Sequence, residues 1–343
     1  MAQVLNGGHT ATAQCVDVQA TKSRVATGGE NGELCLWSLS SGELLDKYVK
    51  PDTDCTSVLF SKSKPNLLYA AFGQEVLIFD TDADFQIPIH TFQCNQEEIN
   101  QIQMDDKEDF LAACDDSGEI KVINVNERKV FKTLRNKHTN ICSTLHFRPG
   151  KPWDLYSGGL DCKLIHWDFA KLKALNQFNM QEMQVTNVDA SAYMVNPPFV
   201  HHIDTSPNGK YLACALENGQ IEVFDTTRRH IREIFSLYAH GQGVSQVSFL
   251  NDDVLVSGGN DCQISLWDLN KSEQYQPQEQ QLVTNGHGAV TLDTKNATIS
   301  ELCKIRSINH SAKINWLKPY TVSGQNFVAA ADQTSRISLL SLV

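Results

Sequence analysis

Three residue types that serine hydrolases use lie close together in the chain, at His138, Ser157 and Asp161. In such an enzyme the aspartate orients the histidine, and the histidine takes the proton of the serine hydroxyl that attacks the substrate. The sequence therefore offers a serine-type hydrolase as one possible function.

The same combination of residues recurs, each time with a tryptophan ten residues after the hydroxyl-bearing residue. The three sets are His138, Ser157, Asp161 and Trp167; His240, Ser257, Asp261 and Trp267; and, in softened form, His9, Thr27, Asn31 and Trp37. An enzyme needs its nucleophile once, and no G-x-S-x-G turn is present. We therefore interpret the sets as structural tetrads in which buried polar groups satisfy one another, and a hydrolase is the least favoured function.

The tetrads belong to an internal repeat. Segments 157–168 and 257–268 match at seven of twelve positions without a gap. Positions equivalent to the tetrad tryptophan are Trp37, Phe79, Ile123, Trp167, Phe224, Trp267 and Leu340. Four of the six separations are 42 to 44 residues, the length of a four-stranded propeller blade. The runs between turns alternate apolar and polar residues, as strands do.

These patterns predict an all-β, seven-bladed propeller as a single domain over residues 1–343. Two longer separations place insertions at 176–199, which contains several methionines, and at 271–300, a flexible polar segment rich in glutamine. An apolar run near Val4 precedes the first blade, while the last blade ends on its third strand. We expect the N-terminal run to pair in the last blade and close the ring.

The composition limits the function classes. A formal net charge of −11 disfavours binding to nucleic acid or to an anionic membrane surface. No apolar stretch is long enough to span a membrane and the N-terminus does not read as a signal peptide, so we expect an intracellular protein of the cytoplasm, the nucleus or both. The ten cysteines show no zinc-ligand spacing. We expect no metal, no cofactor and a monomer.

The Trp-Asp dipeptides at Trp167-Asp168 and Trp267-Asp268, with a histidine 21 to 23 residues before the turn aspartate, resemble the WD-repeat β-propeller family over essentially the whole chain. The resemblance implies a structural role for the tetrads and a non-enzymatic scaffold that binds proteins. Similar members of the family are grouped as candidate substrate receptors of cullin-4 ubiquitin ligases, reached through the adaptor named for damaged-DNA binding.

Receptors of that group commonly carry Trp-Asp-x-Arg. In this chain the position of the arginine is taken by Ser40, Ala170 and Asn270. The nearest match is the run from Phe224 to Arg228, so the resemblance makes Asp225 and Arg228 the candidate adaptor contact.

A second candidate site follows from the blade alignment, which brings one residue per blade to one mouth of the ring. The aligned residues are Glu30, Phe72, Asp116, Leu160, Glu217, Asn260 and Gln333. Together with residues of nearby loops we expect them to form an acidic surface; the added residues are Asp52, Asp54, Glu97, Glu98, Asp115 and Asp332. Such a surface favours a basic peptide, with Phe72 as an apolar anchor. The alternative is that the charges only keep this face soluble.

Overall fold

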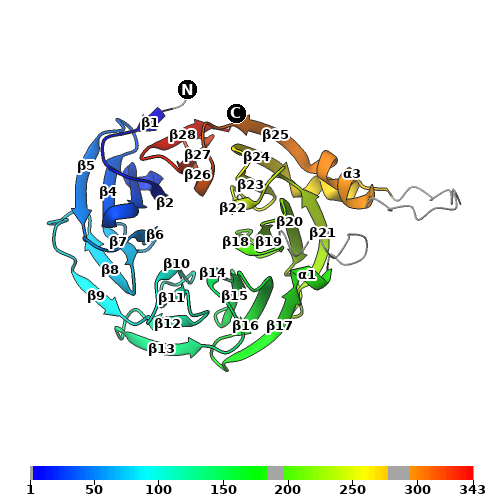
Figure 1. Ribbon diagram of the computed structural model, residues 1–343, viewed down its shortest axis with the longest axis horizontal. Helices are drawn as coiled ribbons and strands as arrows, with labels where there is room; N and C mark the ends of the chain where they lie inside the picture. The colour runs from blue at the N-terminus through cyan, green and yellow to red at the C-terminus, as the bar shows by residue number, and fades with distance from the viewer. Residues whose placement is uncertain (1–2, 184–196, 277–293, 343) are drawn as a thin grey trace, which may run out of the picture.

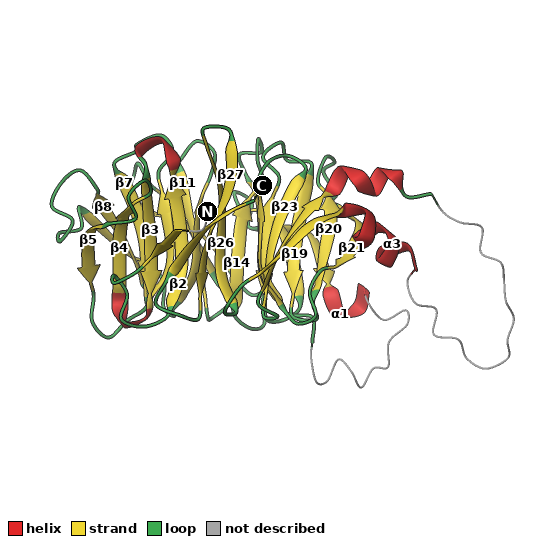
Figure 2. Ribbon diagram, turned by 90° about the horizontal axis from the view of Figure 1, so that it is seen from above, coloured by secondary structure: helices red, strands yellow, loops and turns green. Residues whose placement is uncertain are grey.

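The computed structural model describes residues 3–183, 197–276 and 294–342. These residues form seven four-stranded antiparallel sheets, arranged as the blades of a ring (Figure 1). In side view the strands run between the two faces of the ring, and loops cover both faces (Figure 2). The predicted seven-bladed propeller is confirmed.

Within each blade the first strand lies innermost and the fourth outermost. Blade one comprises β2 (Ala13–Gln19), β3 (Arg24–Gly29), β4 (Glu33–Ser38) and β5 (Leu44–Val49). Blade two comprises β6 (Cys55–Phe60), β7 (Leu67–Phe72), β8 (Glu75–Asp80) and β9 (His90–Gln93). Blade three comprises β10 (Ile99–Met104), β11 (Phe110–Asp115), β12 (Ile120–Asn124) and β13 (Lys129–Leu134). Blade four comprises β14 (Cys142–Phe147), β15 (Asp154–Gly159), β16 (Lys163–Asp168) and β17 (Lys173–Asn179).

The remaining blades follow the same order. Blade five comprises β18 (Val200–Thr205), β19 (Tyr211–Leu216), β20 (Gln220–Asp225) and β21 (Arg232–Tyr238). Blade six comprises β22 (Val244–Phe249), β23 (Val254–Gly259), β24 (Gln263–Asp268) and β25 (Lys304–Asn309). Blade seven comprises β26 (Ile314–Val322), β27 (Gln325–Asp332), β28 (Ile337–Ser341) and β1 (Gln3–Leu5). The helical elements are α1 (Met180–Met183), α3 (Thr294–Cys303), η1 (Ala20–Lys22), η2 (Glu30–Gly32) and η3 (Leu269–Gln274).

The N-terminal strand closes the ring. Strand β1 pairs antiparallel with β28, with Gln3 opposite Leu339 and Leu5 opposite Ile337. Leu5 is fully buried, whereas half the surface of Val4 is exposed. The pairing covers the edge of β28 that an open ring would leave free, so the predicted closure is confirmed.

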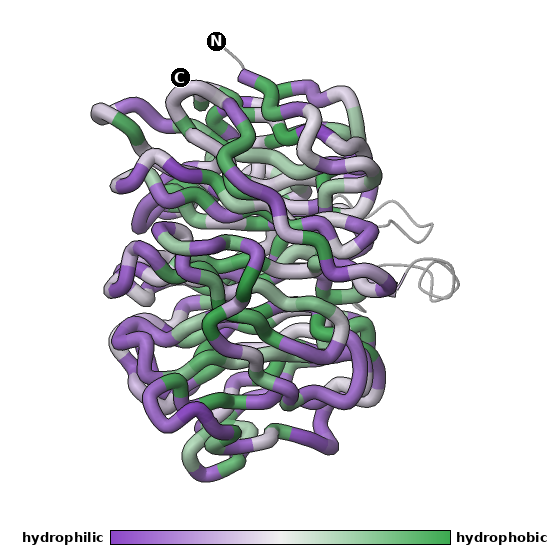
Figure 3. Tube along the Cα trace, turned by 90° about the vertical axis from the view of Figure 1, so that its left-hand side faces the viewer, coloured by the Kyte–Doolittle hydropathy of each residue, from purple (hydrophilic) through white to green (hydrophobic). Residues whose placement is uncertain are grey.

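The hydrophobic core lies between neighbouring blades. Between blades seven and one, Leu5 and Trp37 pack with Ala329, Ala331 and Ile337, so small residues on one blade make room for large ones on the next. Gly8 permits this packing, because a Cβ atom there would lie 2.4 Å from the Trp37 ring. Figure 3 shows hydrophobic and hydrophilic stretches interspersed along the chain, with hydrophilic ones frequent at the outer bends.

Segment 271–300 differs from its prediction. It lies within blade six, between β24 and β25, and its last described part belongs to helix α3. The helix covers the outer edge of β21: the Ser236 N–H donates to Asn296 Oδ1 at 3.2 Å, and the Tyr238 N–H donates to Ser300 Oγ at 2.8 Å. These bonds satisfy part of an otherwise open sheet edge, while Ile299 and Cys303 of the same helix pack into the core.

The other insertion begins later than expected. Residues 176–179 belong to β17, and Met180 of helix α1 is fully buried against blade five. Residues 184–196 and 277–293, which make up much of the two predicted insertions, lie outside the described residues.

Candidate protein-interaction site

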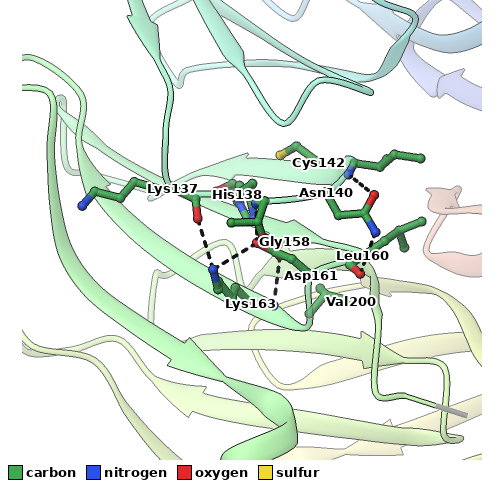
Figure 4. Close-up of polar contacts among 12 residues, drawn as sticks. Lys137, His138, Asn140, Cys142, Gly158, Leu160, Asp161, Lys163 and Val200 are labelled. Atoms are coloured by element: carbon green, nitrogen blue, oxygen red, sulfur yellow. Dashed lines mark hydrogen bonds and ion pairs between the residues drawn. The ribbon is translucent and has the colours of Figure 1, made fainter. Parts of the chain in front are cut away.

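Two complete tetrads are assembled by hydrogen bonds. His138 Nε2 lies 2.8 Å from Ser157 Oγ, and its Nδ1 lies 3.0 Å from Asp161 Oδ1 (Figure 4 shows His138 and Asp161). The Trp167 indole N–H donates to Ser157 Oγ at 2.8 Å. The tetrad joins the loop that enters blade four to its second and third strands.

Blade six repeats this geometry. The corresponding distances are 2.8 Å from His240 to Ser257, 2.9 Å from His240 to Asp261 and 2.9 Å from Trp267 to Ser257. In both blades the serine is fully buried. Its hydroxyl already bonds a histidine and a tryptophan and is closed to a substrate, so the arrangement offers no exposed nucleophile.

The aspartates hold the histidines through charge. Burial alone would raise the pKa of Asp161, but the hydrogen bond and positive potential of His138 and the Thr139 N–H together lower it. The pKa of Asp261 is lowered for the same reasons, with His240 and the Gly241 N–H as partners. The ionised carboxylates therefore fix the orientation of both rings.

The tetrad predicted in blade one is only partly correct. His9 Nε2 lies 2.7 Å from Thr27 Oγ1, which accepts the Trp37 N–H at 2.8 Å. Asn31 does not join them: it is exposed, has a left-handed φ of 63°, and donates to Thr10 Oγ1. The acidic position beside the ring is taken instead by Glu33, whose Oε2 lies 3.5 Å from His9 Nδ1. A turn asparagine tolerates the left-handed backbone but brings no charge to the histidine.

Two further buried pairs were not predicted, one between a histidine and an aspartate and one between an asparagine and an aspartate. Asp332 Oδ2 lies 2.6 Å from His310 Nε2 in blade seven, and Asn95 Nδ2 donates to Asp115 Oδ2 at 2.8 Å in blade three. Both aspartates are buried. The expectation that Asp332 and Asp115 contribute to an exposed acidic surface is therefore wrong, since their carboxylates are used inside the blades. The sequence contains a signal for the first of these pairs. His310 and Asp332 are 22 residues apart, as are His9 and Asn31 in blade one.

We call the face that carries the loops between second and third strands, together with the loops that enter each blade, the upper face. Of the predicted residues on this face, five are exposed and five are half-buried. The exposed ones are Asp52, Glu97, Glu98, Asp116 and Gln333, and the half-buried ones are Glu30, Asp54, Leu160, Glu217 and Asn260. Glu217 Oε2 lies 2.5 Å from His201 Nε2. Phe72 is wrong as an anchor, because it is fully buried with its ring against Tyr48. It fills the core between blades one and two.

Three carboxylates lie close together on this face: Asp54, Glu98 and Asp116. Burial raises the pKa of Glu98, and the negative charges of Asp116 and Asp54 raise it further. Asp54 accepts hydrogen bonds from Gln14 Nε2 at 3.0 Å and from the Asn31 N–H at 3.2 Å. A cavity of about 680 Å³ beside them is lined by Asp52, Asp54, Glu75 and Glu98, with Lys50 paired to Glu75. The three carboxylates therefore form a compact acidic cluster on the upper face.

Two cavities lie beside the innermost strands. The upper one, of about 650 Å³, is lined by Gln246, Trp316 and residues of all the other innermost strands except β14. The lower one, of about 310 Å³, is lined by Asp204, Lys318 and Trp316 among others. Trp316 lines both cavities. Its ring packs against that of His202 at 5.6 Å, and His202 Nε2 lies 3.2 Å from Gln101 Nε2.

The candidate adaptor contact lies on the opposite, lower face. Asp225 is half-buried and stabilises the loop that follows it. Its Oδ1 accepts a hydrogen bond from the Thr227 N–H at 2.9 Å, and its Oδ2 accepts one from Arg232 at 3.3 Å. Arg228 is exposed. Its carbonyl oxygen accepts a hydrogen bond of 2.9 Å from the buried Arg148, which also donates to the Thr226 carbonyl. The loop backbone is thus fixed while the Arg228 side chain faces outward.

Comparison with known proteins agrees with this architecture. The model of the family described as "WD domain, G-beta repeat" matches residues 2–38 and 231–268. The chain is 30% identical to the WD repeat-containing protein 53 homolog of Dictyostelium discoideum, over 98% of this chain and 93% of that protein. The chain belongs to the WD-repeat family.

Other relatives match this WD-repeat protein in part. It is 26% identical to the E3 ubiquitin-protein ligase COP1 of Pisum sativum, over 47% of this chain and 22% of that protein. It is 34% identical to the protein transport protein SEC31 of Saccharomyces cerevisiae, over 26% of this chain and 7% of that protein. A WD-repeat propeller binds other proteins through its faces, and this chain has that general role.

Membrane-spanning helices and metal-binding clusters are both absent from the described residues. No helix among them is both long and apolar enough to cross a membrane. No group of three or more histidine, cysteine, aspartate or glutamate side chains in the same residues is placed to hold a metal ion.

Proposed function

We propose that this WD-repeat protein is an interaction scaffold whose upper face binds a basic segment of a partner protein. The observation that supports the proposal is the mutual proximity of Asp54, Glu98 and Asp116. Among the described residues, no lysine or arginine forms an ion pair with any of the three. A partner's positive charge would relieve their repulsion, and complementary charge accelerates association and fixes its orientation.

The experiment measures the affinity of a fluorescent lysine-rich peptide at several salt concentrations. Glu98→Lys combined with Asp116→Lys should weaken binding at least tenfold at low salt and flatten its salt dependence. Glu301→Lys supplies the control, because it changes an exposed glutamate by the same charge on α3, away from the cluster. Unchanged affinity in the double variant would show that these charges serve only solubility.

A second function, supported by a different observation, is that of a substrate receptor in a cullin-4 ubiquitin ligase. The anchored loop presents Arg228 on the lower face, one position later than in the Trp-Asp-x-Arg pattern of such receptors. The proposal is also supported by the partial similarity to COP1, which is named an E3 ubiquitin-protein ligase. In this function Arg228 would contact the adaptor named for damaged-DNA binding, while Asp225 would hold the loop.

Co-purification with that adaptor tests the second function. Arg228→Ala should abolish recovery of the adaptor and Asp225→Ala should reduce it, because the first removes the contact and the second loosens its loop. Arg229→Ala is the matched control, since Arg229 is the exposed neighbour in the same loop. Equal recovery with all three variants would exclude this surface as the adaptor contact.

A further inference from the structure

Blades three and four carry an excess of positive charge on an otherwise acidic protein. Residues 121–173 contain eleven of the chain's 29 lysines and arginines but only four of its 40 aspartates and glutamates. Two of these four, Asp154 and Asp161, bond a histidine inside blade four. Among the described residues, five of the eleven basic side chains form no ion pair, and all five are exposed or half-buried: Arg128, Lys132, Lys137, Lys151 and Lys173.

An aromatic cluster reaches the surface between the same two blades. Phe131 of β13 stacks with Trp153, with ring centroids 6.3 Å apart, and both rings contact Phe110, at 5.1 and 5.7 Å. Lys132 Nζ lies 5.1 Å from the centroid of the Phe131 ring, and Lys151 is two residues before Trp153 in the same loop. Trp153 is 42% exposed, whereas the other four tryptophans are buried or half-buried. The cluster therefore offers an indole surface next to lysines.

Strand β13 has an open edge beside this cluster. It is the last strand of its sheet and lies on the outer rim of the ring (Figure 1). Among the described residues, no backbone group of β13 forms a hydrogen bond outside its pairing with β12. Other outer edges are covered in part: α3 bonds the edge of β21, and in β5 the Lys47 carbonyl accepts a hydrogen bond from Gln86 Nε2 at 2.7 Å. The edge of β13 can accept a further strand.

We propose that the edge of β13, with Trp153 and the neighbouring lysines, docks an extended acidic segment of a partner protein. The backbone of the segment pairs with β13, an apolar side chain packs on Trp153, and carboxylates lie near Lys132 and Lys151. Phe131 joins the two parts of the surface, because it belongs to β13 and stacks on Trp153. This surface is distinct from the acidic cluster of the upper face and takes a partner of the opposite charge.

The choice of an acidic peptide follows from the charges and the strand edge. Five basic side chains without an ion pair attract carboxylates, and a free sheet edge pairs with an extended backbone. A nucleic acid fits this surface less well. It carries a phosphate at every nucleotide, so it would extend from the basic region onto the rest of a protein whose net charge is −11.

Fluorescence anisotropy with the full chain tests the charges. The probe is a short, labelled and acetylated peptide of alternating glutamate and valine. Lys132→Glu combined with Lys151→Glu should weaken its binding about tenfold at low salt. Lys62→Glu combined with Lys64→Glu is the matched control, because both lysines are exposed in the loop between β6 and β7 and the change in charge is the same.

Two further measurements test the indole contact and the strand pairing. Trp153→Ala should weaken binding about fivefold, whereas Trp153→Phe, which keeps a ring in the cluster, should retain most of the affinity. A peptide with methyl groups on the amide nitrogens of its two central residues keeps its side chains but cannot donate there from either edge. This peptide should also bind about fivefold more weakly.

Each contrary result overturns the proposal in a different way. Equal affinity for the methylated peptide would exclude strand pairing, and equal affinity in the two double-lysine variants would exclude the basic surface. A labelled single-stranded RNA of the same net charge is the competing probe. If the RNA binds more tightly than the peptide and Lys132→Glu combined with Lys151→Glu removes that binding, the surface is a nucleic-acid site. If neither probe binds, the lysines only protect the open edge from aggregation.

Discussion

The Nε2 atom of His138 lies 2.8 Å from the hydroxyl oxygen of Ser157, as in a hydrolase, yet Ser157 is fully buried. The same hydroxyl accepts the indole N–H of Trp167. The pair therefore joins strands instead of activating a nucleophile. This relationship leads to the first prediction.

Ser157→Ala leaves the His138 Nε2 and the Trp167 N–H without a partner. Each buried group left unsatisfied costs about 1–3 kcal/mol, so urea titration should show a lower free energy of unfolding by that amount for each group. Ser311→Ala, an exposed serine, should change it by less than about 0.5 kcal/mol. Equal stability of the two variants would contradict a structural role for the tetrad.

A reactive-serine probe distinguishes the same two interpretations chemically. A fluorophosphonate should not label Ser157 or Ser257 in the folded protein, because both hydroxyls are fully buried and hydrogen-bonded. Peptide mapping by mass spectrometry would locate any adduct. Stoichiometric labelling of either serine would restore the hydrolase interpretation.

Acid should destabilise the fold through two buried histidines. Burial lowers the pKa of His9 and of His202 to about 4. Above pH 6.5 both rings are neutral whether the chain is folded or not; below it the unfolded chain binds a proton that the folded chain refuses until about pH 4. Stability should therefore fall between pH 6.5 and 4, by about 3 kcal/mol for each histidine.

Urea titrations at a series of pH values measure this loss. His202→Gln should make the curve shallower in that window, whereas His230→Gln, which replaces an exposed histidine, should leave it unchanged. Asp161 and Asp261, whose pKa values are lowered, add their own loss at still lower pH, as they become protonated. An identical slope in His202→Gln and the unmodified protein would refute the assignment.

Ring closure depends on one side chain of a three-residue strand, β1. Leu5→Ala should lower the free energy of unfolding by about 2–5 kcal/mol, because it opens a cavity beside Trp37. Val4→Ala, the exposed neighbour on the same strand, should have little effect. Removal of residues 1–7 should give an aggregating or protease-sensitive protein, and an unchanged melting temperature after that deletion would refute closure by β1.

The repeat made the ring predictable, because Trp37, Trp167 and Trp267 mark equivalent strands at regular intervals. The same alignment misplaced Phe72, since it located the residue beside a turn without revealing that its side chain points between blades. Asp332 was misjudged because blade seven has Leu340 where a tryptophan would have marked a tetrad. Strand periodicity finds the blades, but the direction of a side chain at a turn depends on the backbone of that turn.

Helix α3 escaped prediction for another reason. Two of its buried residues, Asn296 and Ser300, are polar and bond the backbone of β21, while Ile299 and Cys303 pack in the core with residues of blades five and six. Sequence patterns detect helices by a continuous apolar stripe, and in this helix polar residues interrupt it.

Trp316, Gln101 and His202 contact one another in sequence, and Trp316 lines both the upper and the lower cavity. Apart from Trp316, the side chains that line the upper cavity differ from those that line the lower one. A partner at the upper face therefore meets other residues than a partner at the lower face, and two different proteins could be bound at the same time.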